Sequence, residues 1–494
     1  MKRFSLCILI LVVALVLASQ EWTSGPGTAR AAPPPGWSEP LNVSKTSAGS
    51  LQPNFVLDSS GAAHVVWTEA HPPGEIYYSK VASGVATTGE NISNTAGASF
   101  SQSIAIDGSG TLHAIWTDQN EGDGDPYYAS KPAGGSWSGH VNIYPTWLYS
   151  PETNIAAESN GDLHVIWSQA MGAAGDIYYC YKPASASSWS GTCGDLDEGN
   201  WGWPSTSNAE LAVDNNGTVH MIQRYELNEG DNLGVAYRSK PRGGSWSGLQ
   251  VISDSPSSGQ APTIAVDSSG AAYSVWVDDR LGNNEIYYAT NADGSWSTPV
   301  NVSQSSGDSN DPRIAVDSTG TVHVVWEEGP EGSREIRYAS KPLGGSWPAP
   351  SGIVDVSNTS GDSILPWIAI GGSNHVHVMW SDSTTGNYEI YYSATASAVK
   401  KPQTPFERCQ WVKARIGEVE LGVDIAFLVA DPGGGWFPWG PSDLIDCGAP
   451  DAPEDIEAVS DCASSYIASL PYHKQWAAFV KWLLGGQPVK CVPQ

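Results

Sequence analysis

Short apolar stretches separated by turns rich in Gly and Asp recur along most of the chain. Residues 311–350 show one complete unit: apolar, aromatic and β-branched positions gather at 313–316, 322–326 and 335–340, and a Gly-Gly turn then leads into Trp347. Short runs of this kind bounded by turn-forming residues indicate strands. The unit therefore predicts a sheet of four short antiparallel strands.

The second strand of this unit recurs along the chain at nearly constant spacing. Its seven copies lie 49 to 56 residues apart, at 64–67, 113–116, 164–167, 220–223, 273–276, 323–326 and 377–380. A period of about 40–50 residues with four strands in each period is typical of a β-propeller blade. We therefore predict an all-β, seven-bladed β-propeller over residues 36–394.

The last repeat lacks an outer strand, and the missing piece lies at the other end of the repeats. Residues 36–44 (GWSEPLNVS) match the outer strand at 295–303 (SWSTPVNVS) nearly position for position. A propeller must join its last blade to its first. A strand supplied by the N-terminal part of the chain would pair with the outer edge of the last blade, which would otherwise lie open. We expect Trp37 to lie in the same sheet as Tyr391.

After residue 394 the composition changes. Residues 395–405 predict a linker, and residues 406–494 predict a small α+β module with strands at 410–416 and 419–429 and helices at 453–470 and 472–484. Cys180 and Cys193 flank a hairpin turn and are the expected local disulfide. The other four cysteines outside the N-terminal segment allow three pairings, which the spacing does not separate: Cys409, Cys447, Cys462 and Cys491.

The N-terminal segment has the pattern of a secretory signal. Lys2 and Arg3 precede a short apolar run, so residues 1–31 are predicted to contain a secretory signal that is cleaved either after residue 18 or after residue 31. We therefore expect a secreted or extracytoplasmic protein, at the cell surface or in the periplasm, that is monomeric and not inserted in a membrane. The formal charge of −28, from 24 basic and 52 acidic residues, argues against a nucleic-acid partner.

One recurring turn resembles a known motif. Residues 130–137 (SKPAGGSW), with copies at 239–246 and 340–347, carry Ser, Gly and Trp at the spacing of the Asp-box of bacterial neuraminidases, with Pro132 at the Asp position. Residues 36–394 thus resemble the sialidase-like propellers. For an enzyme, the resemblance implies a carboxylate clamp of arginines, a Tyr nucleophile with a Glu partner, and an Asp acid. The corresponding candidates here are Arg224, Arg280 and Arg313 for the clamp, Tyr225 or Glu226 near the nucleophile, and Asp278 or Asp279 for the acid.

The loops between the second and third strands differ between repeats and are strongly acidic. In propellers such loops commonly build the functional face, so they predict a ligand-binding rim; the alternative is a solubilising surface. The rim residues are Glu69, Asp118, Glu226, Asp278, Arg280, Glu327, Glu328 and Asp382. No cofactor is expected, although Ca²⁺ could bind the oxygen-rich clusters around Asp123 and Asp125 or around Asp195 and Asp197. Six histidines recur at one strand position, which favours a structural role over a metal site.

The leading hypothesis is a non-catalytic module that binds carbohydrate or a protein surface. It depends on regular blades, variable acidic loops and the lack of a complete catalytic constellation in the sequence. One alternative is a divergent sialidase-like exo-glycosidase that uses the candidates above. Another is that the propeller displays the C-terminal module, which would then be the working part.

Overall fold

The structure is a computed structural model of the 494-residue chain. It describes residues 32–122, 124–146, 149–171, 174–189, 193–196, 206–228, 231–253, 259–395, 409–416 and 419–426. The chain divides into two compact units, residues 1–396 and 397–494. The first unit contains the repeats and is described first.

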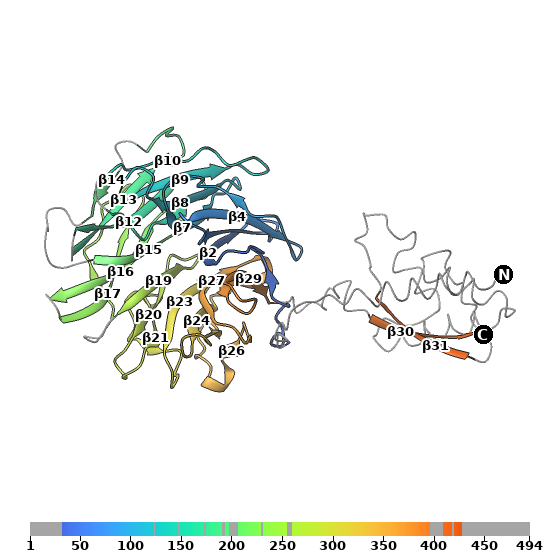
Figure 1. The fold of residues 1–494 in the computed structure, drawn as a ribbon. Helices are drawn as coiled ribbons and strands as arrows, with labels where there is room; N and C mark the ends of the chain where they lie inside the picture. The colour runs from blue at the N-terminus through green and yellow to red at the C-terminus, as the bar shows by residue number, and fades with distance from the viewer. Residues whose placement is uncertain are drawn as a thin grey trace. The chain divides into compact units, whose positions relative to one another are not determined.

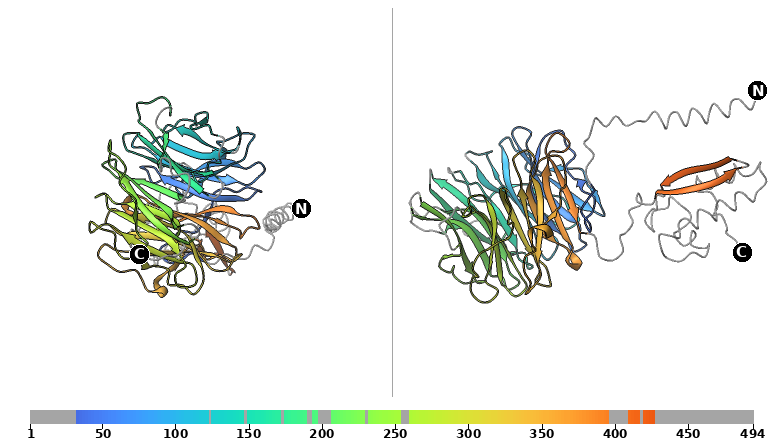
Figure 2. Two further views of the ribbon diagram at one scale, coloured as in Figure 1. Left: turned by 90° about the vertical axis from the view of Figure 1, so that its left-hand side faces the viewer. Right: turned by 90° about the horizontal axis from the view of Figure 1, so that it is seen from below.

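Seven antiparallel sheets form a closed β-propeller, as Figure 1 shows and the two further views of Figure 2 confirm. Neighbouring innermost strands contact one another around the ring, and the last of them contacts the first. In chain order the blades are β2 (Ser50–Leu57), β3 (Ala63–Glu69), β4 (Glu75–Ala82) with β5 (Val85–Ala86) and β6 (Glu90–Asn91); β7 (Ser99–Ile106), β8 (Leu112–Asp118), β9 (Asp125–Lys131), β10 (Val141–Asn142); β11 (Asn154–Ala157), β12 (Leu163–Met171), β13 (Ala174–Lys182), β14 (Cys193–Asp195); β15 (Thr206–Val213), β16 (Val219–Asn228), β17 (Asp231–Lys240), β18 (Gln250–Val251); β19 (Gln260–Val266), β20 (Ala272–Asp278), β21 (Glu285–Thr290), β22 (Val300–Asn301); β23 (Ser309–Val316), β24 (Val322–Glu328), β25 (Glu335–Lys341), β26 (Val354–Asp355); and β27 (Ser363–Ile370), β28 (Val376–Asp382), β29 (Glu389–Ala394) with β1 (Leu41–Asn42). Two short 3-10 turns, η1 (Pro350–Gly352) and η2 (Gly372–Asn374), complete the described elements of this unit.

The predicted ring closure is confirmed. Strand β1 pairs with β29, with Asn42 opposite Tyr391, and Trp37 forms a bridge with Thr395. The backbone N–H of Val43 donates to the carbonyl of Ile390 over 2.7 Å. The N-terminal side of the chain therefore supplies the outer strand of the last blade.

The core lies between the faces of neighbouring sheets. The Trp of the second strand is fully buried in every blade but the fourth, where Gln223 takes its place. Most of these indoles donate to a carboxylate two residues further on: Trp116 Nε1 to Asp118 over 3.0 Å, and Trp380 Nε1 to Asp382 over 3.1 Å. A buried carboxylate without hydrogen-bond donors is strongly destabilising. The indole that donates to it therefore holds the end of the second strand in place.

A second set of contacts joins one blade to the next. Each outer-turn Trp meets a Tyr of the preceding blade edge-on, as Trp137 meets Tyr78 and Trp37 meets Tyr338, both at 5.2 Å between ring centroids. The six recurring histidines bond within their blade: His113 Nδ1 lies 2.8 Å from the Tyr128 hydroxyl and its Nε2 lies 3.3 Å from Asp107. These contacts give the histidines the structural role that their regular spacing favours.

Several predictions fall wholly or partly outside the described residues. They concern the signal segment 1–31, the linker 395–405, the two C-terminal helices and the disulfide partners of Cys409, Cys447, Cys462 and Cys491. Of the second unit the structure describes a hairpin of β30 (Cys409–Ile416) and β31 (Val419–Ala426). The predicted Cys180–Cys193 disulfide is present. No helix within the described ranges is long and apolar enough to cross a membrane.

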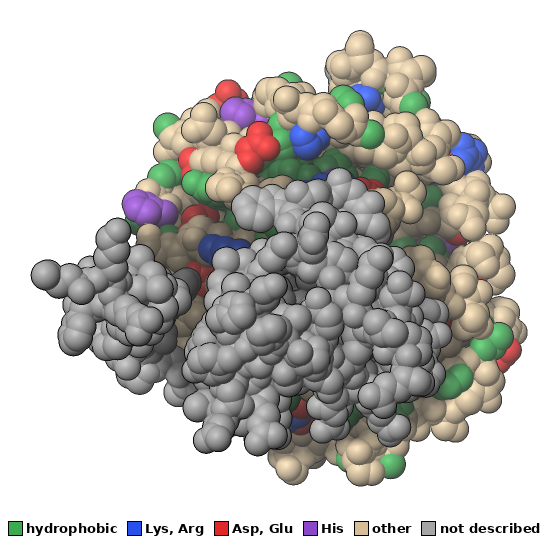
Figure 3. Space-filling view, turned by 90° about the vertical axis from the view of Figure 1, so that its right-hand side faces the viewer, with side chains coloured by type: hydrophobic (Ala, Val, Ile, Leu, Met, Phe, Trp, Pro, Cys, Tyr) green, Lys and Arg blue, Asp and Glu red, His purple; other side chains and the backbone are tan. Residues whose placement is uncertain are grey.

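The charged residues do not form a single broad patch on the visible surface. On the face drawn in Figure 3, acidic, basic and His side chains are scattered among uncharged residues. Polar side chains gather instead around a cavity at the centre of the ring.

Candidate functional site

The innermost strand of each blade is kinked near its start. Six of the seven innermost strands shift register there, for example between Leu51 and Asn54 in β2 and between Asn310 and Arg313 in β23. A β-bulge of this kind leaves residues without a partner in the neighbouring strand and re-aims their side chains. Each blade has one residue with a left-handed φ of 44–61° at this point: Gln52, Ser101, Glu152, Asn208, Ala261, Asp311 and Leu365.

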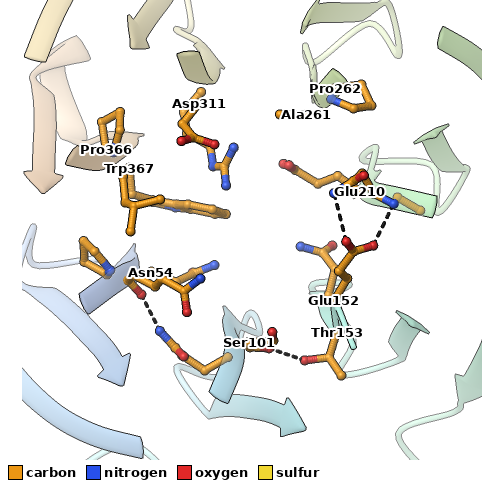
Figure 4. A pocket seen from close by; sticks show the side chains of 18 residues that line it. Asn54, Ser101, Glu152, Thr153, Glu210, Ala261, Pro262, Asp311, Pro366 and Trp367 are labelled. Carbon is orange, nitrogen blue, oxygen red and sulfur yellow. Dashed lines mark hydrogen bonds between the residues drawn. The ribbon is translucent and has the colours of Figure 1, made fainter. Parts of the chain in front are cut away.

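These kinks surround a central cavity of roughly 290 Å³, seen from close by in Figure 4. Left-handed conformations of non-Gly residues are energetically unfavourable, and they concentrate at functional sites. The polar and charged part of the lining consists of Gln52, Asn54, Ser101, Gln102, Glu152, Thr153, Asn154, Asn208, Glu210, Asp311 and Arg313. The remaining lining is apolar: Pro53, Ala209, Ala261, Pro262, Leu365, Pro366 and Trp367.

One side of the cavity carries two glutamates. The Glu152 carboxylate accepts hydrogen bonds from the Asn208 backbone N–H at 2.7 Å, the Asn208 side-chain amide at 2.9 Å and the Ser168 hydroxyl at 2.9 Å. Figure 4 shows Glu210, on β15, pointing into the cavity toward the side that carries Trp367. Three donors hold Glu152 in place, so its position does not depend on a ligand.

Glu210 has a strongly shifted ionisation. Burial raises its pKa to about 7, and the charge of Arg313 and the backbone N–H of Ile264 only partly oppose this effect. A carboxyl group with such a pKa exists in both its neutral and its charged form near neutral pH. Glu210 can therefore donate or accept a hydrogen bond at the cavity wall.

The opposite side of the cavity combines a cation with an aromatic ring. The guanidinium carbon of Arg313 lies 4.6 Å from the centroid of the Trp367 ring, and its Nη1 donates to the Pro312 carbonyl over 2.9 Å. Its Nε is buried and has no hydrogen-bond partner among the described residues. Stacking on Trp367 and the bond to Pro312 hold the Arg313 side chain in position.

Replacing Glu210 by Gln is expected to change how stability depends on pH. The folded state binds the Glu210 proton more tightly than the unfolded state does, so this group's contribution to stability falls as pH rises from about 4.5 through 7. The free energy of unfolding of Glu210→Gln minus that of the wild type should therefore be about 1–3 kcal/mol larger at pH 8 than at pH 5. Urea unfolding at the two pH values measures the difference. Parallel pH profiles for the two proteins would contradict it.

Of the three candidate arginines, Arg313 lines the cavity. Arg280 instead bonds the neighbouring Asp278, with Nε 2.9 Å from Oδ1 and Nη2 2.6 Å from Oδ2, and lies 4.3 Å from the Tyr287 ring centroid. Arg224 lies on β16 opposite Ser207, and its buried Nε has no hydrogen-bond partner in the part of the chain that the structure describes. The structure therefore does not bring these three guanidinium groups together at the cavity lining.

The other enzyme candidates lie outside the cavity lining as well. Tyr225 and Glu226 lie on β16 opposite Gly234 and Leu233, and the Glu226 side chain is outside the described residues. Asp279 follows β20 in a turn in which its carbonyl accepts from the N–H of Gly282 over 2.9 Å. Catalytic roles for these residues stay predictions.

Most of the predicted rim carboxylates are bonded within their own blades. Asp118 accepts from Trp116 and from the Ser99 hydroxyl at 2.9 Å, and Asp382 accepts from Trp380 and from the Ser363 hydroxyl at 3.0 Å. Glu69, Asp278 and Glu328 likewise accept from the indole two residues before them. Glu327 accepts from Arg334 at 2.9 Å and from the Leu365 N–H at 3.0 Å. Ligand binding at this rim stays a prediction.

Calcium binding is likewise untested. The Asp125 carboxylate accepts from the Asn142 amide at 2.7 Å and the Thr146 N–H at 3.0 Å, and Asp195 lies on β14 opposite Tyr178. Asp123 and Asp197 are outside the described residues. Within the ranges that the structure describes, no group of three or more His, Cys, Asp or Glu side chains is arranged to hold a metal ion.

The cavity lining was not predicted as a site, although the sequence contains a signal for it. In four repeats a proline follows the left-handed residue of the first strand: Pro53, Pro262, Pro312 and Pro366. Proline cannot donate to the strand ladder and is tolerated at bulges. A proline at the same register in several first strands therefore marks the kinks that surround the cavity.

The chain was compared with known proteins and solved structures. No protein-family model matches the chain, and no curated protein matches it. Among solved structures, a Dyadobacter fermentans protein of unknown function is 12% identical with a TM-score of 0.47, over 73% of this chain and 99% of that one. The intramolecular trans-sialidase of Ruminococcus gnavus is 9% identical with a TM-score of 0.42, over 70% and 94%. The GH93 α-L-arabinofuranosidase of Fusarium graminearum is 11% identical with a TM-score of 0.44, over 73% and 98%.

Proposed function

We propose that this protein is an exported carbohydrate-binding propeller whose ligand occupies the central cavity and is not turned over. The observation that supports this most is the mixture of groups in the lining: side-chain amides and hydroxyls beside carboxylates, one guanidinium and one indole. Sugar hydroxyl groups need such paired donors and acceptors, and small-ligand sites combine a few placed polar groups with apolar surface. The site thus matches the chemistry of a polyhydroxylated ligand.

The fixed positions of the cavity groups support binding. Asn208 holds Glu152 through its backbone and its side chain, and Trp367 and Pro312 hold Arg313. Groups that are already ordered lose little conformational entropy when a ligand arrives. Such preorganisation favours affinity for a ligand of one shape.

Binding by the wild type and by cavity variants tests the proposal. A glycan array should yield at least one ligand, and calorimetry should show about tenfold or greater weakening in Arg313→Gln, because a charge-assisted contact is lost. Asp293→Asn is the control, since Asp293 is exposed and lies between β21 and β22, outside the lining. A blank array with well-folded protein would contradict the proposal, and capture of a protein partner in its place would favour recognition of a protein surface by the rim.

A divergent glycosidase is the second candidate. Its specific support is Glu210, whose raised pKa of about 7 suits a general acid, in the same lining as the carboxylates of Glu152 and Asp311. Glycosidases use a pair of carboxyl groups in this way. Release of a fluorophore from a sialoside or another glycoside, abolished in Glu210→Gln but kept in Asp293→Asn, would establish turnover. Inactivity across a broad glycoside panel would leave binding alone.

Export and the role of the C-terminal module belong to the same proposal. The segment 1–31 is proposed to direct secretion, and sequencing the N-terminus of the mature protein would show whether cleavage follows residue 18 or 31. The alternative, in which the propeller displays the module of residues 406–494, would be favoured if a chain ending at residue 396 kept its fold and lost a binding activity of the whole protein.

A further inference from the structure

We infer that the sugar bound in the central cavity carries a free amino group, which binds as an ammonium at the Glu210 carboxylate. This inference rests on the proposed carbohydrate-binding function and names the chemical class of the ligand. The charge of the lining, the engagement of each charged group and the uncharged groups beside them support it in turn.

The lining has more negative than positive groups. Three carboxylates, on Glu152, Glu210 and Asp311, face one guanidinium, on Arg313. The nearby charge of Glu327 is balanced by Arg334, because Nη1 of Arg334 lies 2.9 Å from Oε1 of Glu327. A cationic ligand would therefore reduce an unfavourable concentration of like charge at the centre of the ring, whereas an anionic ligand would add to it.

The charged groups differ in how far they are already engaged. Glu152 accepts from Asn208 and Ser168, and Arg313 stacks on Trp367 and donates to Pro312. Glu210 has no side-chain hydrogen bond or ion pair with any described residue, and the backbone N–H of Ile264 is the donor that acts on it. The Asp311 side chain likewise has no hydrogen bond or ion pair with a described residue, so Glu210 and Asp311 are the charged groups of the lining with the most capacity left for a ligand, and Glu210 is the one whose carboxyl group is strongly desolvated by burial.

The raised pKa of Glu210 is consistent with a carboxyl group that has no ion pair with a described residue. Burial raises its pKa to about 7 even though Arg313 lowers it. A second cation within hydrogen-bond distance would favour the charged carboxylate, and the ammonium and carboxylate would then form a charge-assisted bond. An N-acetyl group at the same position would offer a neutral amide and no such bond.

The other lining groups suit the uncharged part of the same ligand. Asn54 and Asn154 offer amide groups for hydroxyls, and Trp367 adds aromatic surface. A primary amine on a pyranose ring therefore accounts for the charged and the uncharged lining together. A simple polyamine would use only the carboxylates.

Three disaccharides that differ at one ring position provide the test. Chitobiose with free amines, its di-N-acetylated form and cellobiose share linkage and ring shape and differ at carbon 2. In calorimetry with the full chain, we expect chitobiose to bind about tenfold or more tightly than the other two. In Glu210→Gln the preference should vanish while weak binding of the neutral sugars remains. Asp293→Asn, which removes the same charge outside the cavity, should keep the preference.

The outcomes separate this inference from the proposed function. If the glycan array yields ligands but acetylated, neutral or uronic-acid forms bind as well as the amine forms, or if Glu210→Gln keeps the preference, the amino-sugar assignment is overturned and carbohydrate binding stands. If chitobiose fails to bind while other glycans on the array do, the assignment is again overturned. If no glycan on the array binds, the proposed function fails and the assignment with it.

Discussion

A chain that begins at residue 47 is expected to lose the stable ring, whereas a chain that begins at residue 33 should melt like the wild type. The shorter chain lacks Trp37, which is 7% exposed, and Val43, which is 1% exposed, together with the whole of β1. Removing a buried Trp alone costs about 3–5 kcal/mol. The loss of both residues approaches the total stability of a typical domain, which is about 5–15 kcal/mol.

The truncation also exposes a strand edge. Without β1, the outer edge of β29 has no partner, and open edges promote association between molecules. Circular dichroism melts and gel filtration would therefore show a lower melting temperature and larger species for the chain from residue 47. If that chain kept the melting temperature of the chain from residue 33, β1 would not be what holds the ring closed.

Replacing Arg334 by Ala is expected to destabilise the propeller strongly. Its guanidinium bonds Asp362 at 2.6 and 3.0 Å and Glu327 at 2.9 Å, and the side chains of both acidic residues are at most 4% exposed. Without Arg334 two buried charges are left without a cation. Removing one partner from such a buried network costs about 3–5 kcal/mol. Urea unfolding at pH 7 measures the loss.

The pH dependence of Arg334→Ala provides a further check. Burial tends to raise the pKa of Asp362, but hydrogen bonds from Arg334 hold it down to about 2. Burial and the charge of Asp311 raise the pKa of Glu327 to about 7 despite Arg334. Without Arg334 both carboxyl groups would bind protons more readily in the folded state, so the loss of stability should be greater at pH 8 than at pH 5.

A matched arginine in the same blade serves as the control. Arg337 pairs with Asp355 at 2.8 Å and with Glu328 at 3.4 Å, and these three side chains are 19–30% exposed, far more than the partners of Arg334. Arg337→Ala should therefore cost no more than about 1 kcal/mol, and its cost should vary little with pH. Equal losses in the two variants would contradict the role assigned to the buried network. The double variant Arg334→Ala with Glu327→Gln should recover part of the lost stability.

The architecture was predictable because the same strand pattern recurs in every repeat. Seven copies of one strand pattern fixed the number of blades, and the likeness of residues 36–44 to residues 295–303 predicted the pairing of Asn42 with the strand that contains Tyr391. Local pairing also made the Cys180–Cys193 disulfide predictable. These features depend on spacing along the chain, which the sequence displays directly.

The candidate site was less predictable because it depends on register at the centre of the ring. The acidic residues after the second strand look like a surface feature in the sequence, yet Asp118 and Asp382 are buried and bonded to indoles two residues away. Arg280 and Arg313 look equivalent by composition, but the first bonds its neighbour Asp278 and the second lines the cavity. Side-chain direction at a bulge does not follow strand alternation, so pattern alone could not separate them.

The seven kinks have a consequence for how this protein can diversify. Kink side chains such as Gln52 and Asp311 lie outside the regular strand pairing and make no hydrogen bond with a described side chain, so they can be exchanged without repacking a sheet, whereas the buried indoles cannot. Selection could thus vary what the protein recognises while leaving its framework intact. Related chains would be expected to differ most at positions such as Gln52, Ala261 and Asp311, and an engineer seeking a new specificity would begin there.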